Sequence, residues 1–436
     1  MLTQKMRAVI VADPTLVNRE IVMKYLTTLA VLLATTSLAS AASQDNESFI
    51  LQAGKKNTAL VAQKNGDNGQ ATLQFGKGNQ AITAQKTSGT DTNSSGTLQI
   101  GNNNTAIAAQ AGGNNAQGTL QVGNNNTALT VQANTSADLN KSGSVQLGNG
   151  NTSVAVQSQG DNTQNTIQLD NKNAALTVQA NGAKGGNNNS ATIEAGVNNA
   201  AVTLQATTGA GTGAAKDAAG GDNNSATLQF GRNNVAVTAQ DSTGTGSGAN
   251  AAGGVENAAA TLQVGKKDVA VTAQGGARSG KAADQTSNDS FTGQFGNGDT
   301  AVAAQKNGNN DQATVQVGNN NTALTAQKTA DAGTGTNGSL TLQVGNGNLA
   351  LARQTIANPS NATNGSLLAQ IGKNNTALAS QGETGLQKMI GANLQATVQV
   401  GNDNTSITTQ TASASVSNTS VTAQFGSHNV AITSQH

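Results

Sequence analysis

The chain has 436 residues and a net charge near +1, with 52 glycines, two prolines and no cysteine. Its sparse, balanced charge excludes a basic nucleic-acid surface and an acidic tail, and aromatic residues, at 2%, are too few for base stacking. Low hydrophobicity with abundant Asn, Gly, Ser and Thr would by itself suggest disorder, but a strict periodicity argues against that interpretation.

Residues 23–41 have the organisation of a secretory signal peptide. The stretch MKYLTTLAVLLATTSLASA places one lysine before an apolar run, and residues 39–41 supply the small side chains of a cleavage site. We therefore expect a secreted mature chain of residues 42–436 that folds without disulfides. Residues 1–22 are either a mis-assigned start, with translation beginning at Met23, or an extended n-region, and we favour the first.

From residue 46 to residue 435 the chain is one repeat, N-x5-Q-x-G-x2-N-x-A-x3-Q, in fifteen copies. The opening Asn and the closing Gln occur in every copy, and the central Gln is replaced only by Glu194. The Gly is missing once, at Asp170, and the middle Asn becomes Asp at Asp268 and Asp299. The apolar positions, in contrast, vary freely among Leu, Ile, Val and Phe.

Each copy divides into two similar halves whose side chains alternate with period two, which predicts two strands. The G-x-x-N stretch between the halves is typical of a tight turn, and no proline interrupts the strands. Added length falls only between copies, as in residues 206–222 and 241–256, so we expect the longer loops at one edge. The predicted fold is an all-β solenoid of about fifteen strand-turn-strand rungs that form two facing parallel sheets.

The invariant amides predict hydrogen-bonded ladders along the solenoid. In stacked rungs each Asn or Gln lies above its equivalent and can donate and accept along the axis. Leu and Val can replace each other in a column and still pack, whereas a missing amide interrupts the ladder on both sides. The predicted ladder residues of the early copies are Asn68, Gln74, Asn79, Gln85, Asn93, Gln99, Asn104, Gln110, Asn115, Gln121, Asn126 and Gln132, with turn glycines Gly54, Gly76, Gly101, Gly123 and Gly148.

At this motif the chain resembles the curlin family, the subunits of curli, which are extracellular amyloid fibres of bacterial biofilms. The family repeat is S-x5-Q-x-G-x2-N-x-A-x3-Q, and the resemblance covers residues 46–435, with Asn in place of the first Ser and more copies than the best-known members. The resemblance implies export through a dedicated outer-membrane curli secretion channel, a nucleator subunit as partner, and polymerisation. Major and nucleating subunits are not separable by the motif, although the regularity favours a bulk fibre component.

The resemblance and hydrophobic burial disagree about which face of the rung is inside. In curlin repeats the amides lie in the interior, whereas here Thr72 and Ser95 share the amide face and Leu73, Phe75 and Ile82 lie on the other. A one-residue slip in register exchanges the two faces. Because burial contributes roughly 25 cal/mol per Å² of apolar surface, we expect the apolar face inside. In the alternative register the apolar rows face outward and favour lateral bundling of fibres.

The ends of the predicted solenoid indicate self-assembly. Only residues 42–45 precede the first copy in the expected mature chain, and His436 alone follows the last, so we expect neither end to carry a cap. Head-to-tail addition of such copies gives a filament. We therefore expect a secreted structural subunit at the cell surface, with the chain itself as partner, serving biofilm matrix and adhesion.

Catalysis has little support in the sequence. His428 lies in a predicted turn and the other histidine is at the terminus, and there is no Cys to act as nucleophile or ligand. Asp268 and Asp299 lie in adjacent copies, but replacement of an amide by an acid explains them without an active site. The glycine-rich turns lack the strand-loop-helix context of a phosphate-binding loop. We predict no enzyme, no metal and no cofactor.

Two other functions remain open, a monomeric β-solenoid adhesin and an ice-binding protein that uses the threonine column as a flat array. Cationic side chains gather in the predicted turns, where they would aid solubility and oppose misregistered pairing. They could instead contact acidic matrix polysaccharide or DNA, although no specific nucleic-acid site is predicted. These residues are Lys55, Lys56, Lys77, Arg232, Lys266 and Lys267.

Overall fold

The computed structural model describes residues 46–87, 91–134, 139–182, 186–212, 221–247, 256–279, 287–329, 335–356, 362–383, 391–412 and 417–436. The expected signal peptide, its cleavage site and the stretch before it lie outside the described residues.

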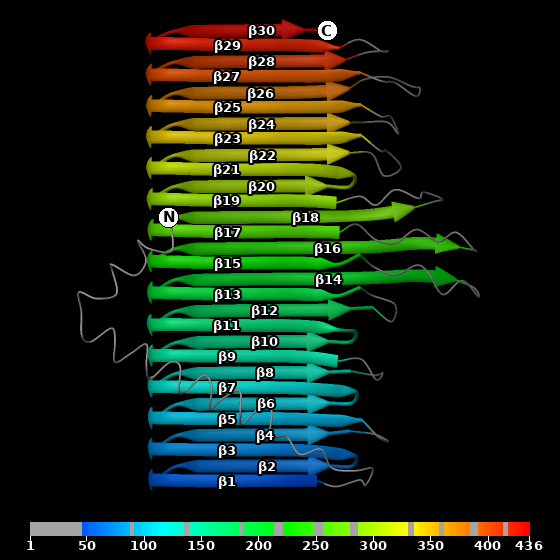
Figure 1. Ribbon diagram of the computed structural model, residues 1–436, viewed down its shortest axis with the longest axis vertical. Coiled ribbons are helices and arrows are strands. Elements are labelled where there is room, and N and C mark those ends of the chain that lie inside the picture. Colours follow the sequence, from blue (N-terminus) through cyan, green and yellow to red (C-terminus); the bar gives the residue numbers. More distant parts are fainter. Residues whose placement is uncertain are drawn as a thin grey trace, which may run out of the picture.

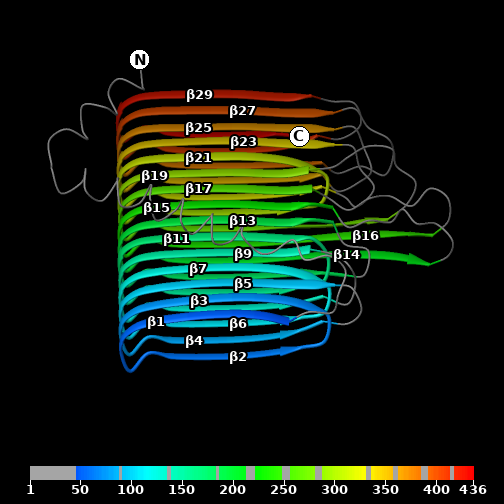
Figure 2. The ribbon, with the colours of Figure 1, turned by 60° about the horizontal axis from the view of Figure 1, so that its bottom comes forward.

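Thirty strands form two parallel sheets of fifteen strands each, with the odd-numbered strands in one sheet and the even-numbered strands in the other (Figure 1). Each rung is an odd strand followed by an even strand, and the two sheets lie as two layers (Figure 2). The predicted all-β solenoid of two facing parallel sheets is therefore confirmed.

The first sheet consists of β1 (Asn46–Lys55), β3 (Asp67–Lys77), β5 (Thr92–Asn102), β7 (Asn114–Asn124), β9 (Leu139–Asn149), β11 (Asn162–Asn171), β13 (Asn188–Val197), β15 (Asn223–Arg232), β17 (Glu256–Lys266), β19 (Ser287–Asn297), β21 (Asn309–Asn319), β23 (Thr336–Asn346), β25 (Thr363–Lys373), β27 (Ala392–Asn402) and β29 (Asn418–Ser427). The second sheet consists of β2 (Thr58–Lys64), β4 (Gln80–Lys86), β6 (Thr105–Ala111), β8 (Thr127–Ala133), β10 (Thr152–Ser158), β12 (Ala174–Asn181), β14 (Ala200–Thr212), β16 (Val235–Ser247), β18 (Val269–Ser279), β20 (Thr300–Lys306), β22 (Thr322–Thr329), β24 (Leu349–Ile356), β26 (Thr376–Glu383), β28 (Thr405–Ala412) and β30 (Val430–Gln435).

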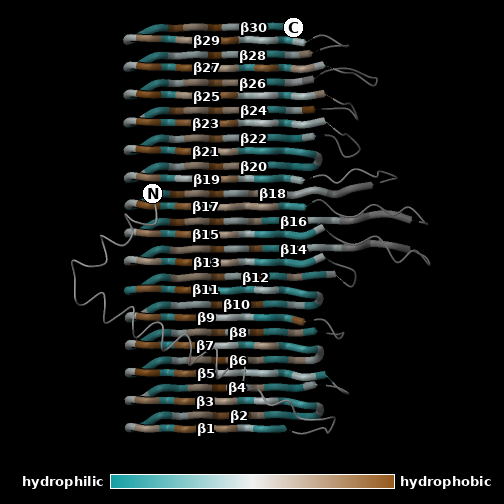
Figure 3. The backbone as a smooth tube through the Cα atoms, viewed as in Figure 1, coloured by the Kyte–Doolittle hydropathy of each residue, from teal (hydrophilic) through white to brown (hydrophobic). Residues whose placement is uncertain are grey.

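The register places each motif position beside the same position of the next rung. Gln74 of β3 pairs with Gln99 of β5, and Gln85 of β4 pairs with Gln110 of β6. Hydropathy consequently repeats from rung to rung along the stack (Figure 3). The short turns within the rungs lie along one edge, and the connections between rungs lie along the other (Figure 1).

Three strands of the second sheet extend beyond the body of the solenoid at the edge that carries the longer connections. The sequence predicts loops after the closing Gln of these copies, but β14, β16 and β18 continue into that region as paired strands (Figure 1). The alternating Thr and Gly of TTGAGT and STGTGS fit a strand as well as a loop, which explains the difference.

The expectation that the apolar face is buried is wrong. Gln74 and Thr72 are buried, at 0% and 1% exposure, whereas Leu73 and Phe75 on the other parity are only half-buried, and so is Ile82 in the second sheet. Leu98 and Leu120 are exceptions, because they are buried at outward positions. The interior therefore consists mainly of amides, hydroxyls and the small alanines of the second sheet.

The interior amides are buried at little cost because they are hydrogen-bonded within the stack. An amide without partners costs about 1–3 kcal/mol when buried, and that penalty disappears when its donors and acceptors are satisfied. The small inward residues Ala81 and Ala106, at 2% and 3% exposure, leave the facing Gln side chains room to reach across to the other sheet. Apolar area alone does not include this contribution from hydrogen bonding.

Candidate functional site

The central glutamines form a hydrogen-bonded column along the first sheet. Gln74 Nε2 donates to Gln99 Oε1 at 2.7 Å, and Gln99 Nε2 donates to Gln121 Oε1 at 2.8 Å. Gln121 Nε2 also donates to the Thr105 carbonyl oxygen of the facing sheet at 2.9 Å. Gln74, Gln99 and Gln121 therefore each bond to the rung before, to the rung after and to the opposite layer.

The closing glutamines form a second column with the same direction. Gln85 Nε2 donates to Gln110 Oε1, and Gln110 Nε2 donates to Gln132 Oε1, both at 2.8 Å. This column runs without a break from Gln63 to Gln435. In both columns the donor lies in the earlier rung, so the ladders give the solenoid a fixed polarity.

The opening asparagines form a column of the opposite direction. Asn115 Nδ2 donates to Asn93 Oδ1 at 2.8 Å, so here the donor lies in the later rung. Asn68 donates in the same way to Asn46 at 2.6 Å, but the link between Asn68 and Asn93 is missing and Asn68 Oδ1 has no partner. Asn93 Nδ2 donates instead to the Lys86 carbonyl oxygen at 3.3 Å.

The middle asparagines hold the turns together through the backbone. Asn104 Oδ1 accepts the backbone N–H of Asn126 at 3.0 Å, and Asn104 Nδ2 donates to the Gly123 carbonyl oxygen at 2.8 Å. Asn79 makes the same contacts with the next rung, at 3.0 Å to the Asn104 N–H and 2.9 Å to the Gly101 carbonyl oxygen. In these rungs the column recognises the main chain of the neighbouring rung. In the later rungs side-chain bonds are added, as where Asn348 Nδ2 donates to Asn321 Oδ1 at 3.1 Å.

The turn glycines need both their backbone angle and their missing side chain. Gly123 has a φ of 124°, and a Cβ there would overlap the Gly148 carbonyl oxygen of the next rung. The other four predicted turn glycines lie in the same column and face the same obstruction, which accounts for the constancy of this position. These are Gly54, Gly76, Gly101 and Gly148.

A fifth column, made of asparagines, lies on the exposed turns and is not among the predicted ladders. Asn102 Nδ2 donates to Asn124 Oδ1 at 2.9 Å, and the series continues from Asn124 to Asn149 and from Asn149 to Asn171 at 3.0 and 3.1 Å. The recurrence of GNNN and GNGN is the signal for this column in the sequence, but Asn after Gly is also typical of a tight turn, so the pattern alone predicts only the turn.

Three carboxyl groups occupy amide positions in the buried columns. Glu194 lies in the central Gln column, and Asp268 and Asp299 lie in the middle Asn column, all at 0% exposure. Burial raises the pKa of Glu194 from 4.5 to about 8 and that of Asp299 to about 6, and it also raises the pKa of Asp268. The structure places Asp268 beside Asp299 in the turns of adjacent rungs, and Glu194 in β13, away from both.

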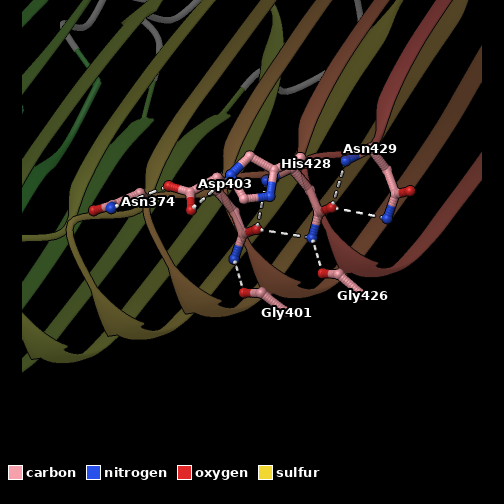
Figure 4. Close-up of polar contacts among 8 residues, drawn as sticks. Asn374, Gly401, Asp403, Gly426, His428 and Asn429 are labelled. Carbon is pink, nitrogen blue, oxygen red and sulfur yellow. Dashed lines mark hydrogen bonds and ion pairs between the residues drawn. The ribbon is translucent and has the colours of Figure 1, made fainter.

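The turn around His428 is an exposed surface feature. His428 Nε2 lies 3.7 Å from Asp403 Oδ2, and Asp403 Oδ1 accepts a hydrogen bond from Asn374 Nδ2 at 3.2 Å (Figure 4). The His428 side chain is 80% exposed. Gly401 and Gly426, beneath these side chains, present carbonyl oxygens to the middle Asn column (Figure 4). These carbonyl contacts to the middle Asn column are the same as those in the turns of the other rungs.

The two end rungs offer complementary groups. At one end Gln424 and Gln435 accept from the preceding rung, at 2.7 Å each, and among the described residues neither has a glutamine beyond it to receive its second N–H. At the other end Gln52 and Gln63 donate to the following rung, and their Oε1 atoms receive no bond from the described chain. One end presents amide donors and the other presents amide acceptors.

The chain matches no protein-family model and no curated protein. The resemblance to curlin repeats therefore rests on the motif alone. Within the described ranges, no group of three or more His, Cys, Asp or Glu residues is placed to hold a metal ion. No helix in the same part of the chain is long and apolar enough to span a membrane.

Proposed function

We propose that the protein is a secreted structural subunit that adds head-to-tail to copies of itself and forms an extracellular, curli-like amyloid fibre. The observation that carries the proposal is the complementarity of the two end rungs. If a second copy stacks its β1 and β2 on β29 and β30, Gln424 and Gln435 can donate to its Gln52 and Gln63 as they would to one more rung. The ladders then continue through the junction.

The polarity of the columns supports head-to-tail addition over the alternatives. Two copies joined by their β29–β30 ends would place donors against donors, and two copies joined by their β1–β2 ends would place acceptors against acceptors. The opening Asn column favours the same orientation, because its donors and acceptors are reversed at both ends. A contact between unlike ends that does not close into a ring gives a filament.

The biological setting follows from the resemblance and the expected signal peptide. We propose that the fibre serves biofilm matrix and adhesion, and that a nucleator subunit and an outer-membrane secretion channel act as partners. Exposed turn lysines such as Lys266 and Lys267 are available for contact with acidic matrix polysaccharide. Nothing favours the ice-binding alternative, because Thr72 and Thr227 of its proposed array are buried, at 1% exposure each.

The test is elongation of preformed fibre fragments by the double variant Gln424→Glu/Gln435→Glu. Each Glu can still accept from the preceding rung, so the ladders within the monomer continue to the last rung. The variant loses the outward donors together with the two bonds to the Thr405 and Thr419 carbonyl oxygens. Thr419→Glu/Ser434→Glu is the matched control, because it adds the same charge to the same strands at outward positions.

We expect elongation, followed by thioflavin fluorescence, to slow by about tenfold or more in the ladder variant and to remain near the original rate in the control. Equal rates for the two variants would show that the end amides do not join copies. A protein that remains monomeric under all assembly conditions would contradict the proposal itself.

A further inference from the structure

The central Gln column is broken at one place, between Glu194 and Gln229. Gln168 Nε2 donates to Glu194 Oε2 at 2.7 Å, so the column arrives at Glu194 in the usual way. Beyond it, Glu194 Oε1 and Gln229 Oε1 are both buried and neither has a hydrogen-bond partner. Gln229 then donates to Gln263 at 2.7 Å and the column resumes.

At this break two acceptor oxygens, Glu194 Oε1 and Gln229 Oε1, face each other, whereas every other step of the column pairs a donor with an acceptor. A glutamine at position 194 would donate through Nε2 to Gln229 Oε1, as Gln168 donates to Glu194. An ionised carboxylate has no proton to offer and places charge against the lone pairs of Gln229. One proton on Glu194 Oε1 removes the charge and supplies the missing donor.

Asp268 and Asp299 show the same defect in the middle Asn column. Their Oδ1 atoms act as an asparagine oxygen does, accepting the backbone N–H of Asp299 at 3.1 Å and of Asn321 at 2.9 Å. Their Oδ2 atoms are buried without a partner. In Asn321 the equivalent Nδ2 donates to the Gly345 carbonyl oxygen at 3.0 Å, so each Oδ2 stands where a donor is required.

Apart from protonation, the surroundings of Glu194, Asp268 and Asp299 provide nothing that would compensate three buried negative charges. The groups facing Glu194 are Gln168 and Gln229 from the adjacent strands and the Ala201 backbone from the facing sheet, none of which titrates. Asp268 and Asp299 face each other, with asparagines on either side of the pair. Lys266 and Lys267 share the turn with Asp268 but are exposed, and within the described part of the chain they form no ion pair with it.

We propose that Glu194, Asp268 and Asp299 are protonated in the folded solenoid and act as hydrogen-bond donors that complete the amide columns. The solenoid is thereby proton-dependent at two places, the contact between β13 and β15 and the stacked turns that join β17 to β18 and β19 to β20. Because each group lies inside one copy, the inference concerns the folded chain and holds whether or not copies assemble. Burial also raises the pKa values of all three carboxyl groups, which agrees with the geometry.

The expected consequence is a stack that weakens as the pH rises. Folded and unfolded chains hold these protons equally in acid, but only the folded chain holds them between the ordinary carboxyl range and the raised pKa values, so stability falls across that interval. At higher pH the charged groups face acceptors, and the stack should open first at these rungs. Replacing the acids by amides supplies permanent donors and should remove the pH dependence.

The experiment compares the full chain with the triple variant Glu194→Gln/Asp268→Asn/Asp299→Asn. The first readout is the infrared band of protonated carboxyl groups near neutral pH, which should be present in the folded original protein, absent after unfolding and absent in the variant. At this pH the band reports mainly Glu194, because the pKa of Asp299 is raised only to about 6. The second readout is the guanidinium midpoint for loss of β-structure between about pH 5 and pH 9, which should fall for the original protein and stay level for the variant.

Asp403→Asn is the matched control, because it also replaces an acid by an amide but at an exposed turn position, and it should retain the pH dependence of the original protein. Absence of the protonated band, or a variant less stable than the original protein above neutral pH, would overturn the proposal. Stabilisation of the original protein, but not of the variant, by millimolar Ca²⁺ or Mg²⁺ at neutral pH would also overturn it in favour of a cation between Asp268 and Asp299.

Discussion

Exchanging an inward amide for an apolar residue of similar size gives a direct measure of what holds the rungs together. In the variant Gln121→Leu the side chain loses its bond to Gln146 Oε1, its bond to the Thr105 carbonyl oxygen and the bond it accepts from Gln99. Gln99 keeps its second bond, to the Gln80 carbonyl oxygen, whereas Gln146 Oε1 becomes a buried acceptor without a partner.

The magnitude follows from these three bonds. The orphaned Gln146 oxygen costs about 1–3 kcal/mol and the other two bonds about 1 kcal/mol each. Burial of the leucine side chain returns about 2 kcal/mol. We expect the free energy of unfolding to fall by about 2 kcal/mol. The outward Leu129 is half-buried, so Leu129→Ala should cost only about 1 kcal/mol.

The assay is guanidinium unfolding of the full chain, followed by circular dichroism, with both variants measured beside the original protein. The order of the two effects is the informative result. If the apolar face were the core, Leu129→Ala would cost about 2–5 kcal/mol and Gln121→Leu would change little or stabilise. Observation of that second order would refute the account of the interior.

The remaining predictions concern the turns, the buried acids and the outer surface. Gly123→Ala should destabilise by several kcal/mol in the same unfolding assay, because its Cβ would overlap the Gly148 carbonyl oxygen at a φ of 124°, and a cost under about 1 kcal/mol would contradict this. Stability should fall as the pH rises from about 4.5 through about 8, because the pKa of Glu194 is raised over that interval, and the loss is on the order of 5 kcal/mol, measured by unfolding at each pH. Phe230→Ser/Phe295→Ser removes two outward rings, each 38% exposed, and should reduce side-by-side association of fibres in electron micrographs while elongation rates stay unchanged; unchanged bundling would exclude these rings as the contact.

The fold could be predicted from the sequence because a strict repeat constrains it at every copy. Period-two alternation predicts the strands, the constant G-x-x-N spacing predicts the turn, and insertions confined to one position predict a common loop edge. Parallel, in-register stacking then follows, since only that arrangement places like residues together. The continuation of β14 and β16 beyond the body was missed because Thr and Gly alternation fits both strands and loops.

The buried face could not be predicted from apolar area, because the deciding term is the satisfaction of polar groups. Gln121 has no exposure and three hydrogen-bond partners. A hydrophobicity scale gives one transfer free energy for a glutamine side chain and takes no account of such partners. The constancy of the amides against the drift of Leu, Val and Ile was the signal for the interior. The same logic indicates why Glu194 matters, since loss of its proton would interrupt a column that is otherwise continuous from Gln52 to Gln424.

Mass per length of assembled fibres, measured by scanning transmission electron microscopy together with fibre diffraction, tests head-to-tail stacking most directly. Fifteen rungs at about 4.8 Å each predict one chain for about every 70 Å of a single filament. In fibre diffraction the reflection from the strand spacing should lie along the fibre axis. A protein that yields no fibres, or fibres whose mass per length is not a whole multiple of that value, would contradict the account.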